Sequence, residues 1–342
     1  MPGRDCAAKS RACSYEEACM YKVIMAPTDG SGFDREAIRV ALRIAEQSGA
    51  KLRLVRVLAT GSFFGMAATA EGTAIAAEVV HSERDQALTE LYALAAECRV
   101  TSNAEVTVDL HAGPIGDVLE GYARRNEVDL IVISTHGRSG ISRLSLGSVT
   151  DSLIRHTTIP VLVVKPPTSY LNPQVSHAFR RIVVPLDGST LAEQILPRVL
   201  ALAKLEEAEI TLLNVLIPKS YSQQEVEDPT LPWWDKDISR AQAYLHRVAG
   251  KLRRNGVTVT TDIVIGENVA GAIGDFAGRE RADLIAIATH GRGGLARLIR
   301  GSVADAVMHS SRVSMLVFRP ENVAEMGKSP SEDGVRADLI PA

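Results

Sequence analysis

The chain has 342 residues, which at about 150 residues per domain predicts two domains. Its 38 basic and 41 acidic residues leave a net charge of −3, so electrostatics gives no reason to expect nucleic acid as a main partner. The hydrophobic content of 46% excludes global disorder, and the absence of a spanning apolar run or an apolar signal stretch predicts a cytoplasmic protein with no membrane partner.

The first residues of the chain differ from the rest. Cys6, Cys13 and Cys19 lie close together there and Cys98 stands apart, a spacing that fits neither a disulfide framework nor a zinc site. We expect residues 1–19 to form a mobile N-terminal extension. An alternative is that Met20, directly before an apolar strand, is the true start.

The chain repeats itself. Residues 128–166 align without a gap with residues 282–320 and are identical at 18 of 39 positions. Upstream, KVIMAPTDGS at 22–31 matches RIVVPLDGST at 181–190, so we predict two copies of one unit. The predicted domains are 20–165 and 180–320, joined by a proline-containing linker at 166–179 and followed by a mobile tail at 321–342.

Short β-branched runs alternate with helical patterns in each copy, which predicts an α/β fold with a five-stranded parallel sheet and helices on both faces. The predicted strands are 22–27, 51–58, 105–110, 129–134 and 160–164, then 181–186, 209–216, 257–264, 283–288 and 314–318. The predicted helices include 34–48, 73–98, 190–205 and 237–254. Gly49 is the expected C-terminal cap of the first, and Pro197 is expected to bend the third. Gly113-Pro114, after the third strand, is interpreted as the entry to the next helix.

Parallel sheets bind ligands beyond the carboxyl ends of their strands, where the strand order reverses. Asp29 and Asp187 follow the first strand of each copy. Gly147-Ser148 and Gly301-Ser302 precede a helix that the serine is expected to cap. Because glycine lets backbone N–H groups approach an anion, these segments predict phosphate cradles.

Other nucleotide and catalytic motifs do not occur. The sequence has no P-loop, and Arg35 stands where a dinucleotide fingerprint requires glycine after Gly30 and Gly32. It also has no serine nucleophile elbow at a strand-to-helix turn and no repeated cluster with metal-ligand spacing.

The pattern of Asp29, the Thr-His-Gly-Arg of 135–138, and Gly147-Ser148-Val149 resembles the universal stress protein family, and the second copy repeats every part in the same order. The resemblance covers nearly all of the chain outside the tails and the linker. The family's nucleotide motif is G-x-x-G-x9-G-[ST]; Ser134 and Ala288 replace its first glycine.

The resemblance implies two tandem Rossmann-like domains of the adenine nucleotide alpha hydrolase-like class that bind ATP. It assigns Asp29 and Asp187 to the ribose, and Leu52 and Ile210 to backbone contacts with adenine. Magnesium would be held by the phosphate oxygens and water, with no protein metal ligand. The phosphate contacts are assigned to Gly137, Arg138, Gly147, Ser148 and Val149, and in the second copy to Gly291, Arg292, Gly301, Ser302 and Val303.

Several of these residues have structural alternatives. The two aspartates are also typical helix caps. The arginines around the glycine loops are compatible with contacts to phosphate and equally with a solvated loop; these are Arg138, Arg143, Arg292, Arg297 and Arg300. We interpret His136 and His290 as bonding loop backbone, because neither has a repeated carboxylate or nucleophile beside it. Trp233 and Trp234 are expected to pack between the copies, with covering a ligand as the alternative.

The resemblance implies a stress-response module that binds an adenine nucleotide and has no dedicated catalytic residues. Two alternatives remain: a slow ATP hydrolase of the same fold, and an interaction scaffold that has lost its nucleotide. The apolar fifth strands are expected at sheet edges that need cover. In the family they pair across a dimer, which implies an internal pseudo-dimer here and allows a homodimer.

Overall fold

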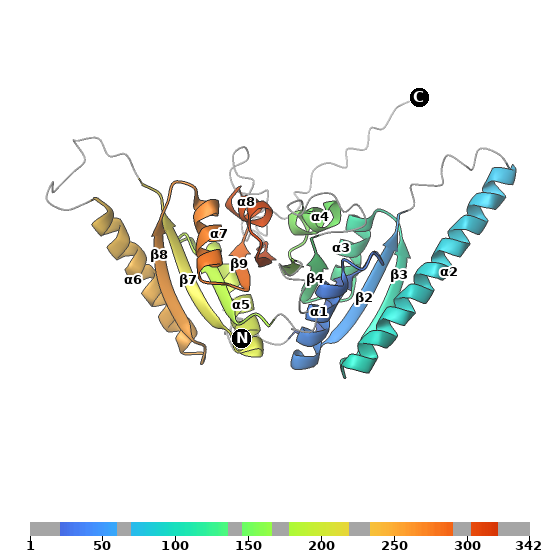
Figure 1. The fold of residues 1–342 in the computed structure, drawn as a ribbon, viewed down its shortest axis with the longest axis horizontal. Coiled ribbons are helices and arrows are strands. Elements are labelled where there is room, and N and C mark those ends of the chain that lie inside the picture. The colour runs from blue at the N-terminus through green and yellow to red at the C-terminus, as the bar shows by residue number, and fades with distance from the viewer. Residues whose placement is uncertain are drawn as a thin grey trace, which may run out of the picture.

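The computed structural model describes residues 21–59, 70–135, 146–165, 178–218, 233–289 and 302–320. Both copies follow one order of strands and helices (Figure 1). The first copy comprises β1 (Val23–Pro27), α1 (Arg35–Ser48), β2 (Lys51–Leu58), α2 (Ala70–Thr101), β3 (Val106–Ala112), α3 (Ile115–Arg125), β4 (Leu130–Ser134), α4 (Ser148–His156) and β5 (Val161–Val164).

The second copy repeats these elements with one short addition, the 3-10 helix η2 (Ala192–Ile195). Its elements are β6 (Arg181–Pro185), α5 (Leu196–Glu206), β7 (Glu209–Leu216), α6 (Trp233–Arg253), β8 (Val259–Ile265), α7 (Val269–Arg279), β9 (Leu284–Ala288), α8 (Ser302–Ser310) and β10 (Ser314–Phe318). The predicted α/β architecture with parallel strands is confirmed.

The ten strands form one sheet in the order β3-β2-β1-β4-β5-β10-β9-β6-β7-β8. All pairings within a copy are parallel, and the strand order of the first copy reverses between β1 and β4. The fifth strands of the two copies meet at the centre, where β5 and β10 pair antiparallel with Leu162 opposite Leu316. Counted outward from the centre, the second copy therefore repeats the strand order of the first copy, with its strands pointing in the opposite direction.

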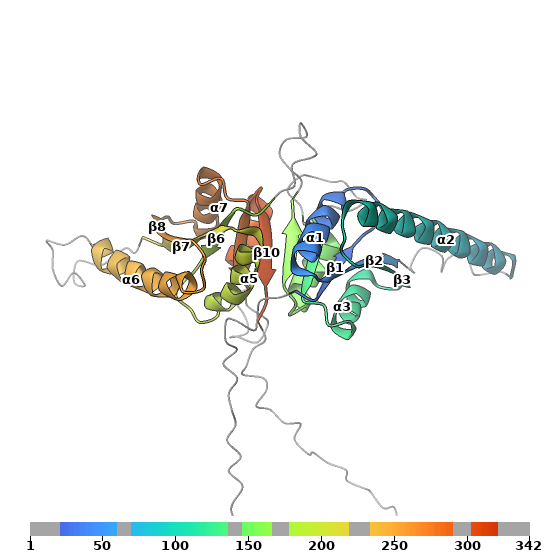
Figure 2. The same cartoon turned by 90° about the horizontal axis from the view of Figure 1, so that it is seen from below.

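Helices cover both faces of the sheet. Figure 2 shows α1 and α3 on opposite sides of the first copy's strands, and α5 and α7 on opposite sides of the second copy's strands. The strands alternate between the two faces, so Leu52 and Leu54 join the core layer that includes α1, whereas Val55 joins the layer that includes α3. Each layer is continuous across both copies. The continuously apolar strands are explained by this two-sided burial.

Two helix boundaries lie where the sequence predicted them, and one predicted helix bend does not occur. Gly49 is the left-handed C-cap of α1, with a φ of 70°, as predicted. Pro114 is the N-cap residue of α3, which confirms that the Gly113-Pro114 pair marks the entry to that helix. The prediction for Pro197 was wrong: it lies in the first turn of α5, where no N–H is needed, so η2 precedes a new helix and no interior bend occurs.

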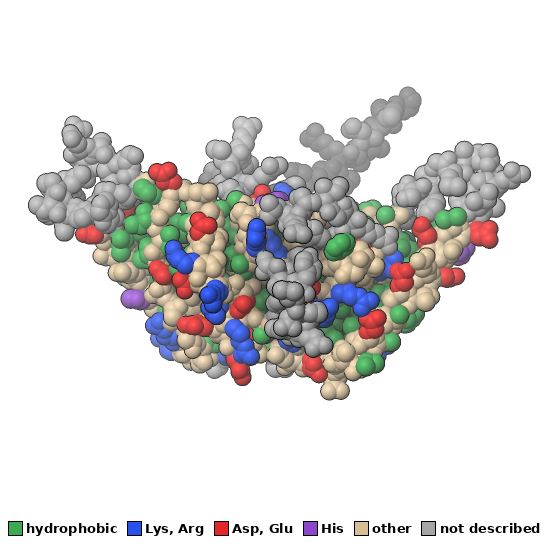
Figure 3. Space-filling view, in the orientation of Figure 1, with side chains coloured by type: hydrophobic (Ala, Val, Ile, Leu, Met, Phe, Trp, Pro, Cys, Tyr) green, Lys and Arg blue, Asp and Glu red, His purple; other side chains and the backbone are tan. Residues whose placement is uncertain are grey.

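Charged side chains of both signs are interspersed over the face of the molecule in Figure 3. None of the helices in the described parts of the chain has the length and apolar character needed to cross a membrane.

Two cations hold the halves together reciprocally. Lys165, directly after β5, donates through Nζ to the carbonyl oxygens of Met308 (2.8 Å) and Ser311 at the end of α8. Arg319, the matching residue after β10, donates to the carbonyl oxygen of Arg155 near the end of α4. Carbonyls at a helix C-terminus carry partial negative charge and lack intrahelical donors. Each copy therefore supplies the cation for the other copy's last helix.

A buried ion pair joins α1 to α5. Arg43 contacts Glu206 through Nε and Nη2, at 3.1 and 2.8 Å, and the Glu206 side chain is only 1% exposed. The Arg43 guanidinium also lies over the ring of Phe179, 5.6 Å from its centroid. Phe179, at the end of the predicted linker, is itself buried in the core.

Replacing Arg43 should destabilise the fold strongly, because the Glu206 carboxylate would be left buried without its charge partner. We expect Arg43→Met to lower the free energy of unfolding by about 3–5 kcal/mol, measured by urea denaturation. The double variant Arg43→Met/Glu206→Met should recover most of this loss, since it removes the unpaired charge. If Arg43→Met and the double variant had equal free energies of unfolding, the unpaired Glu206 carboxylate would not be the cause of the loss.

The stability of the junction should depend on pH through Lys165. Burial lowers the pKa of this amine from 10.5 to about 8. Between these values the unfolded chain holds a proton that the folded protein has released, so the free energy of unfolding rises with pH, by at most about 1.4 kcal/mol per unit. Urea denaturation at several pH values in this window should show the rise in the wild type and lack it in Lys165→Met.

Candidate functional site

A cavity of about 600 Å³ opens at the carboxyl ends of β1, β2 and β4. It lies where the strand order reverses, the position at which open parallel sheets bind ligands. Its size falls within the usual range of small-molecule sites, about 300–1,000 Å³. Its wall is built from Pro27, Thr28, Asp29, Asp34, Val55, Arg56, Val57, Leu58, Ala59, Glu83, Gln86, Ile115, Leu119, Ile133, Ser134, Thr135, Gly147, Ser148, Val149 and Thr150.

The end of the cavity beside β1 carries carboxylates. Asp29 accepts a hydrogen bond from the backbone N–H of Ser31 (2.9 Å), which forms a tight turn over Gly30 at a φ of 75°. The Thr28 hydroxyl donates to the buried Asp34 carboxylate and accepts from the Gly30 N–H at 3.1 Å. Asp29 therefore belongs to this turn, whereas the N-cap position of α1 is Asp34.

The wall beside β2 is formed by an ion pair with α2. Arg56, whose side chain is 8% exposed, donates from Nη1 to Oε2 of Glu90 at 2.6 Å. The other oxygen of Glu90 accepts from the Gln86 side chain at 2.9 Å. Arg56 also packs on the turn, since a Cβ built on Gly30 would lie 2.9 Å from its Nη1. Glu90 thus orients two side chains that line the cavity.

The opposite end of the cavity is the N-terminus of α4. Gly147 is the N-cap residue and has no side-chain cap, so the helix begins at Ser148. The prediction that Ser148 caps this helix was therefore wrong. The Gly147 N–H donates to the Thr135 carbonyl at 2.9 Å, and the Thr150 hydroxyl donates to the Ser134 carbonyl at 3.0 Å. Both bonds fix the start of α4 against the end of β4.

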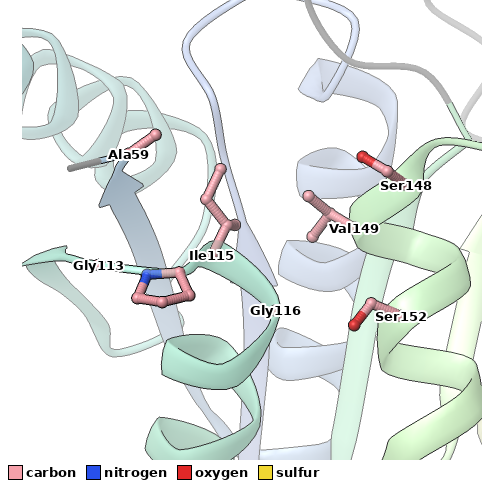
Figure 4. Close-up of a pocket in the computed structure, with 8 residues that line it drawn as sticks. Ala59, Gly113, Ile115, Gly116, Ser148, Val149 and Ser152 are labelled. Atoms are coloured by element: carbon pink, nitrogen blue, oxygen red, sulfur yellow. The ribbon is translucent and has the colours of Figure 1, made fainter. Parts of the chain in front are cut away.

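A second cavity of about 490 Å³ adjoins the first and shares Ala59, Ile115, Ser148 and Val149 with it. In Figure 4, Ile115 of α3 and Val149 of α4 face one another across this space, while Ser148 and Ser152 lie along the same side of α4. The helices approach closely below it, because a Cβ on Gly116 would lie 2.6 Å from the Ser152 Oγ. The site is thus a crevice that extends from β1 past α4 toward α3.

In the structure, Leu52 and Ile210 do not lie at the carboxyl ends of their strands, where a ligand would bind. Both lie near the amino ends of β2 and β7, are fully buried, and donate their N–H groups to Glu105 and Thr258 of the neighbouring chain segment. A backbone group already bonded inside a sheet does not meet a ligand at the other end of the strand. On β2, the residues from Val55 to Leu58 line the cavity instead.

The remaining predicted residues divide into three groups. Asp29, Gly147, Ser148 and Val149 meet at the cavity. In the second copy, Asp187 accepts from Ser189 N–H as Asp29 does from Ser31, and Ser302 and Val303 begin α8. Other residues with predicted roles lie outside the described residues or have undescribed side chains; these are Gly137, Arg138, Gly291, Arg292, Gly301, His136, His290, Arg143, Arg297, Arg300, Trp233 and Trp234.

Sequence reasoning missed Thr28, Asp34, Arg56, Glu83 and Gln86 as parts of the wall. Arg56 lies between Val55 and Val57 near the carboxyl end of β2, but the same strand also contains Lys51 and Arg53, so the sequence did not distinguish it. Within the described residues, no group of three or more His, Cys, Asp or Glu side chains is arranged to hold a metal ion.

The buried Thr28–Asp34 pair should be important for the first copy's stability. Thr28→Val removes the hydroxyl that donates to Asp34, and we expect a loss of about 1–3 kcal/mol in the free energy of unfolding. Adding Asp34→Ala should restore part of this loss, because the second copy has Leu186 and Ala192 at the matching positions. Calorimetry or urea denaturation would measure both, and an unchanged Thr28→Val variant would refute the role of the pair.

Comparison with known proteins identifies related chains. The model of the universal stress protein family matches twice, at residues 20–165 and 178–319. A universal stress protein of Methanocaldococcus jannaschii is 35% identical over 149 residues, 43% of this chain and 84% of the relative. Another, of Mycobacterium bovis, is 26% identical over 317 residues, 86% of this chain and 94% of the relative.

Among solved structures, the crystal structure of a universal stress protein from Archaeoglobus fulgidus superimposes with a TM-score of 0.61 at 17% identity. The alignment covers 87% of this chain and 98% of that chain. At this identity the likeness concerns the fold. It extends over both copies, consistent with the two family matches.

Proposed function

The chain belongs to the universal stress protein family, and we propose that it is a stress-response module that binds an adenine nucleotide, with ATP as the ligand, at the crevice of its first copy. Asp29, Gly147, Ser148 and Val149 form the described part of this proposed site. The matching residues of the second copy remain predictions. No residue is assigned to catalysis.

The proposal rests on one observation: one end of the cavity offers a carboxylate that accepts hydrogen bonds, and the other end offers backbone N–H groups that donate them. At one end the wall offers the Asp29 carboxylate after β1, and Glu83 of α2 also lines the cavity. Carboxylates accept hydrogen bonds from ribose hydroxyls or an exocyclic amine. At the other end, the first turn of α4 presents N–H groups without intrahelical partners, together with the positive end of the helix dipole. A nucleoside with a phosphate chain has the complementary arrangement of donors and negative charge.

The residues present fit the phosphate group. Gly147 has no side chain at the point where the chain enters α4, and Ser148 adds a hydroxyl beside it. Glycine at such a point allows close approach of backbone to an anion. Magnesium, where bound, would be held by phosphate oxygens and water. ATP, recognised by its charge and shape, would be the signal to which the module responds.

The pairing of β5 with β10 supports a further part of the proposal, that the two copies act as a dimer within one chain. Each strand is covered on its open edge by the other, so neither copy presents that edge to solvent. A homodimer of whole chains would have to use another surface.

The direct test is to purify the full chain, denature it, and identify any released nucleotide by mass spectrometry. We expect an intact adenine nucleotide in amounts comparable to the protein. Release of ADP and phosphate from added ATP, with saturation, would favour the hydrolase alternative. Retention of no nucleotide, together with no binding of added ATP in equilibrium dialysis, would refute the proposal and favour the scaffold.

Ser148→Asp should separate binding from folding. A carboxylate in the first turn of α4 is favourable for the helix, by about 0.3–1 kcal/mol, but it occupies the space proposed for phosphate and repels it. We therefore expect ATP binding to weaken by about tenfold or more with an unchanged or higher melting temperature. Ser148→Ala is the matched control and should keep most of the affinity; equal affinities for the two variants would contradict the site.

A further inference from the structure

The two copies share a fold but differ in the residues that surround the acid after their first strand. At four of these positions the first copy has a polar residue, and the second copy has a different residue at every matching position. Thr28, Asp34, Arg56 and Glu90 correspond to Leu186, Ala192, Asn214 and Tyr244.

The correspondence of the helices can be checked from their packing. Leu91 and Ala95 of α2 match Leu245 and Ala249 of α6, and all four are fully buried in the same core layer. Further along, Arg99 donates to the carbonyl oxygen of the first residue of β3, and Arg253 does the same for β8. Glu90 and Tyr244, one residue before the matched leucines, therefore occupy equivalent places.

In the first copy these residues brace the Asp29 turn. Glu90 holds Arg56 with one oxygen and Gln86 with the other, and the Arg56 guanidinium lies against Gly30. On the opposite side, the Thr28 hydroxyl bonds both the Gly30 N–H and Asp34. A turn held from two sides loses little conformational freedom when a ligand binds, which favours affinity.

The described part of the second copy lacks this bracing. Among the described residues, no atom beyond the two adjacent residues lies within 4 Å of a Cβ built on Gly188, and Leu186 places a buried apolar side chain where Thr28 offers a hydroxyl. Asn214 turns its amide toward the Leu186 carbonyl at 2.6 Å, and its Oδ1 has no hydrogen-bond partner among the described residues. Tyr244 offers an uncharged phenol where the first copy has the Glu90 carboxylate, and burial and the nearby Glu193 carboxylate raise its pKa further. Among the described residues, α8 also has Ala304 in place of Thr150.

We propose that the chain holds a single nucleotide, in the first copy, and that Glu90 is the positioning residue that makes this copy the binding half by fixing Arg56 and Gln86 in the cavity wall. This inference depends on the proposed function. Glu90 itself does not line the cavity; it acts through the two side chains that do.

Equilibrium dialysis of the full chain with ATP and magnesium tests the stoichiometry. We expect one ATP per chain in the wild type and no stoichiometric binding in Asp29→Ala. Two ATP per chain would overturn the inference while leaving the proposed function intact. One ATP remaining in Asp29→Ala would contradict both the inference and the proposed first-copy site. A wild type that binds no adenine nucleotide would instead refute the proposed function.

A matched set of variants tests Glu90. Glu90→Leu should weaken ATP binding about tenfold, because Arg56 and Gln86 lose the acceptor that fixes them in the cavity wall. Glu90→Gln keeps an acceptor for Arg56 and should recover most of the affinity. Tyr244→Leu, at the equivalent place in the second copy, should leave ATP binding unchanged.

Urea denaturation of the three variants separates positioning from general stability. Glu90 is half-exposed but its partner Arg56 is buried, so Glu90→Leu leaves the guanidinium unpaired and should lower the free energy of unfolding. ATP binding is therefore compared without urea, where each variant is shown to be folded by its own unfolding curve. The role of Glu90 is refuted if Glu90→Leu binds ATP as the wild type does, if Glu90→Gln is as weak as Glu90→Leu, or if Tyr244→Leu weakens binding equally.

Discussion

The antiparallel pairing of β5 with β10 is the contact on which the rest of this structure depends. β5 is apolar and buried throughout, and β10 is apolar and buried after its first residue, Ser314. Either strand left unpaired would therefore expose a row of backbone donors and acceptors at the edge of an apolar surface. Pairing them merges two five-stranded sheets into one. The two core layers then run without interruption from one copy to the other.

This central junction also determines how the candidate site is supported. The cavity is bounded by the start of α4, and the end of the same helix receives its cation from Arg319 of the second copy. The helix is only nine residues long, too short to be stable without tertiary contacts at both ends. The second copy thus contributes to the site through the helix it anchors, even though none of its described residues lines the cavity.

The sequence predicted most of the fold because its local signals agreed with the tertiary structure. The apolar run of β4 is buried throughout its first four residues, and Gly49 ends α1 in the left-handed conformation that glycine favours. The candidate site was predicted less completely. Leu52 was assigned by resemblance to the strand position that contacts adenine through its backbone, and the structure shows that its N–H is already bonded to Glu105 at the amino end of β2.

The importance of Arg56 was not predictable, because a cation in a strand is normally a sign of a solvent-exposed face. Its burial follows from Glu90, 34 residues away on a helix, and such a pairing leaves no periodic signal in the sequence. The roles of Gly147 and Ser148 also differ by one position from the prediction. A serine after glycine fits either the cap or the first turn of a helix, and only the backbone geometry distinguishes the two.

The reciprocal reach of Lys165 and Arg319 has a consequence for the peptide that joins the copies. Backbone pairing, two shared core layers and two crossed cations already hold the halves in place, so the connecting segment mainly raises the local concentration of one half near the other. Proteolytic cleavage between the copies would then yield two fragments that stay associated as a heterodimer, and separately expressed halves would be able to reassemble.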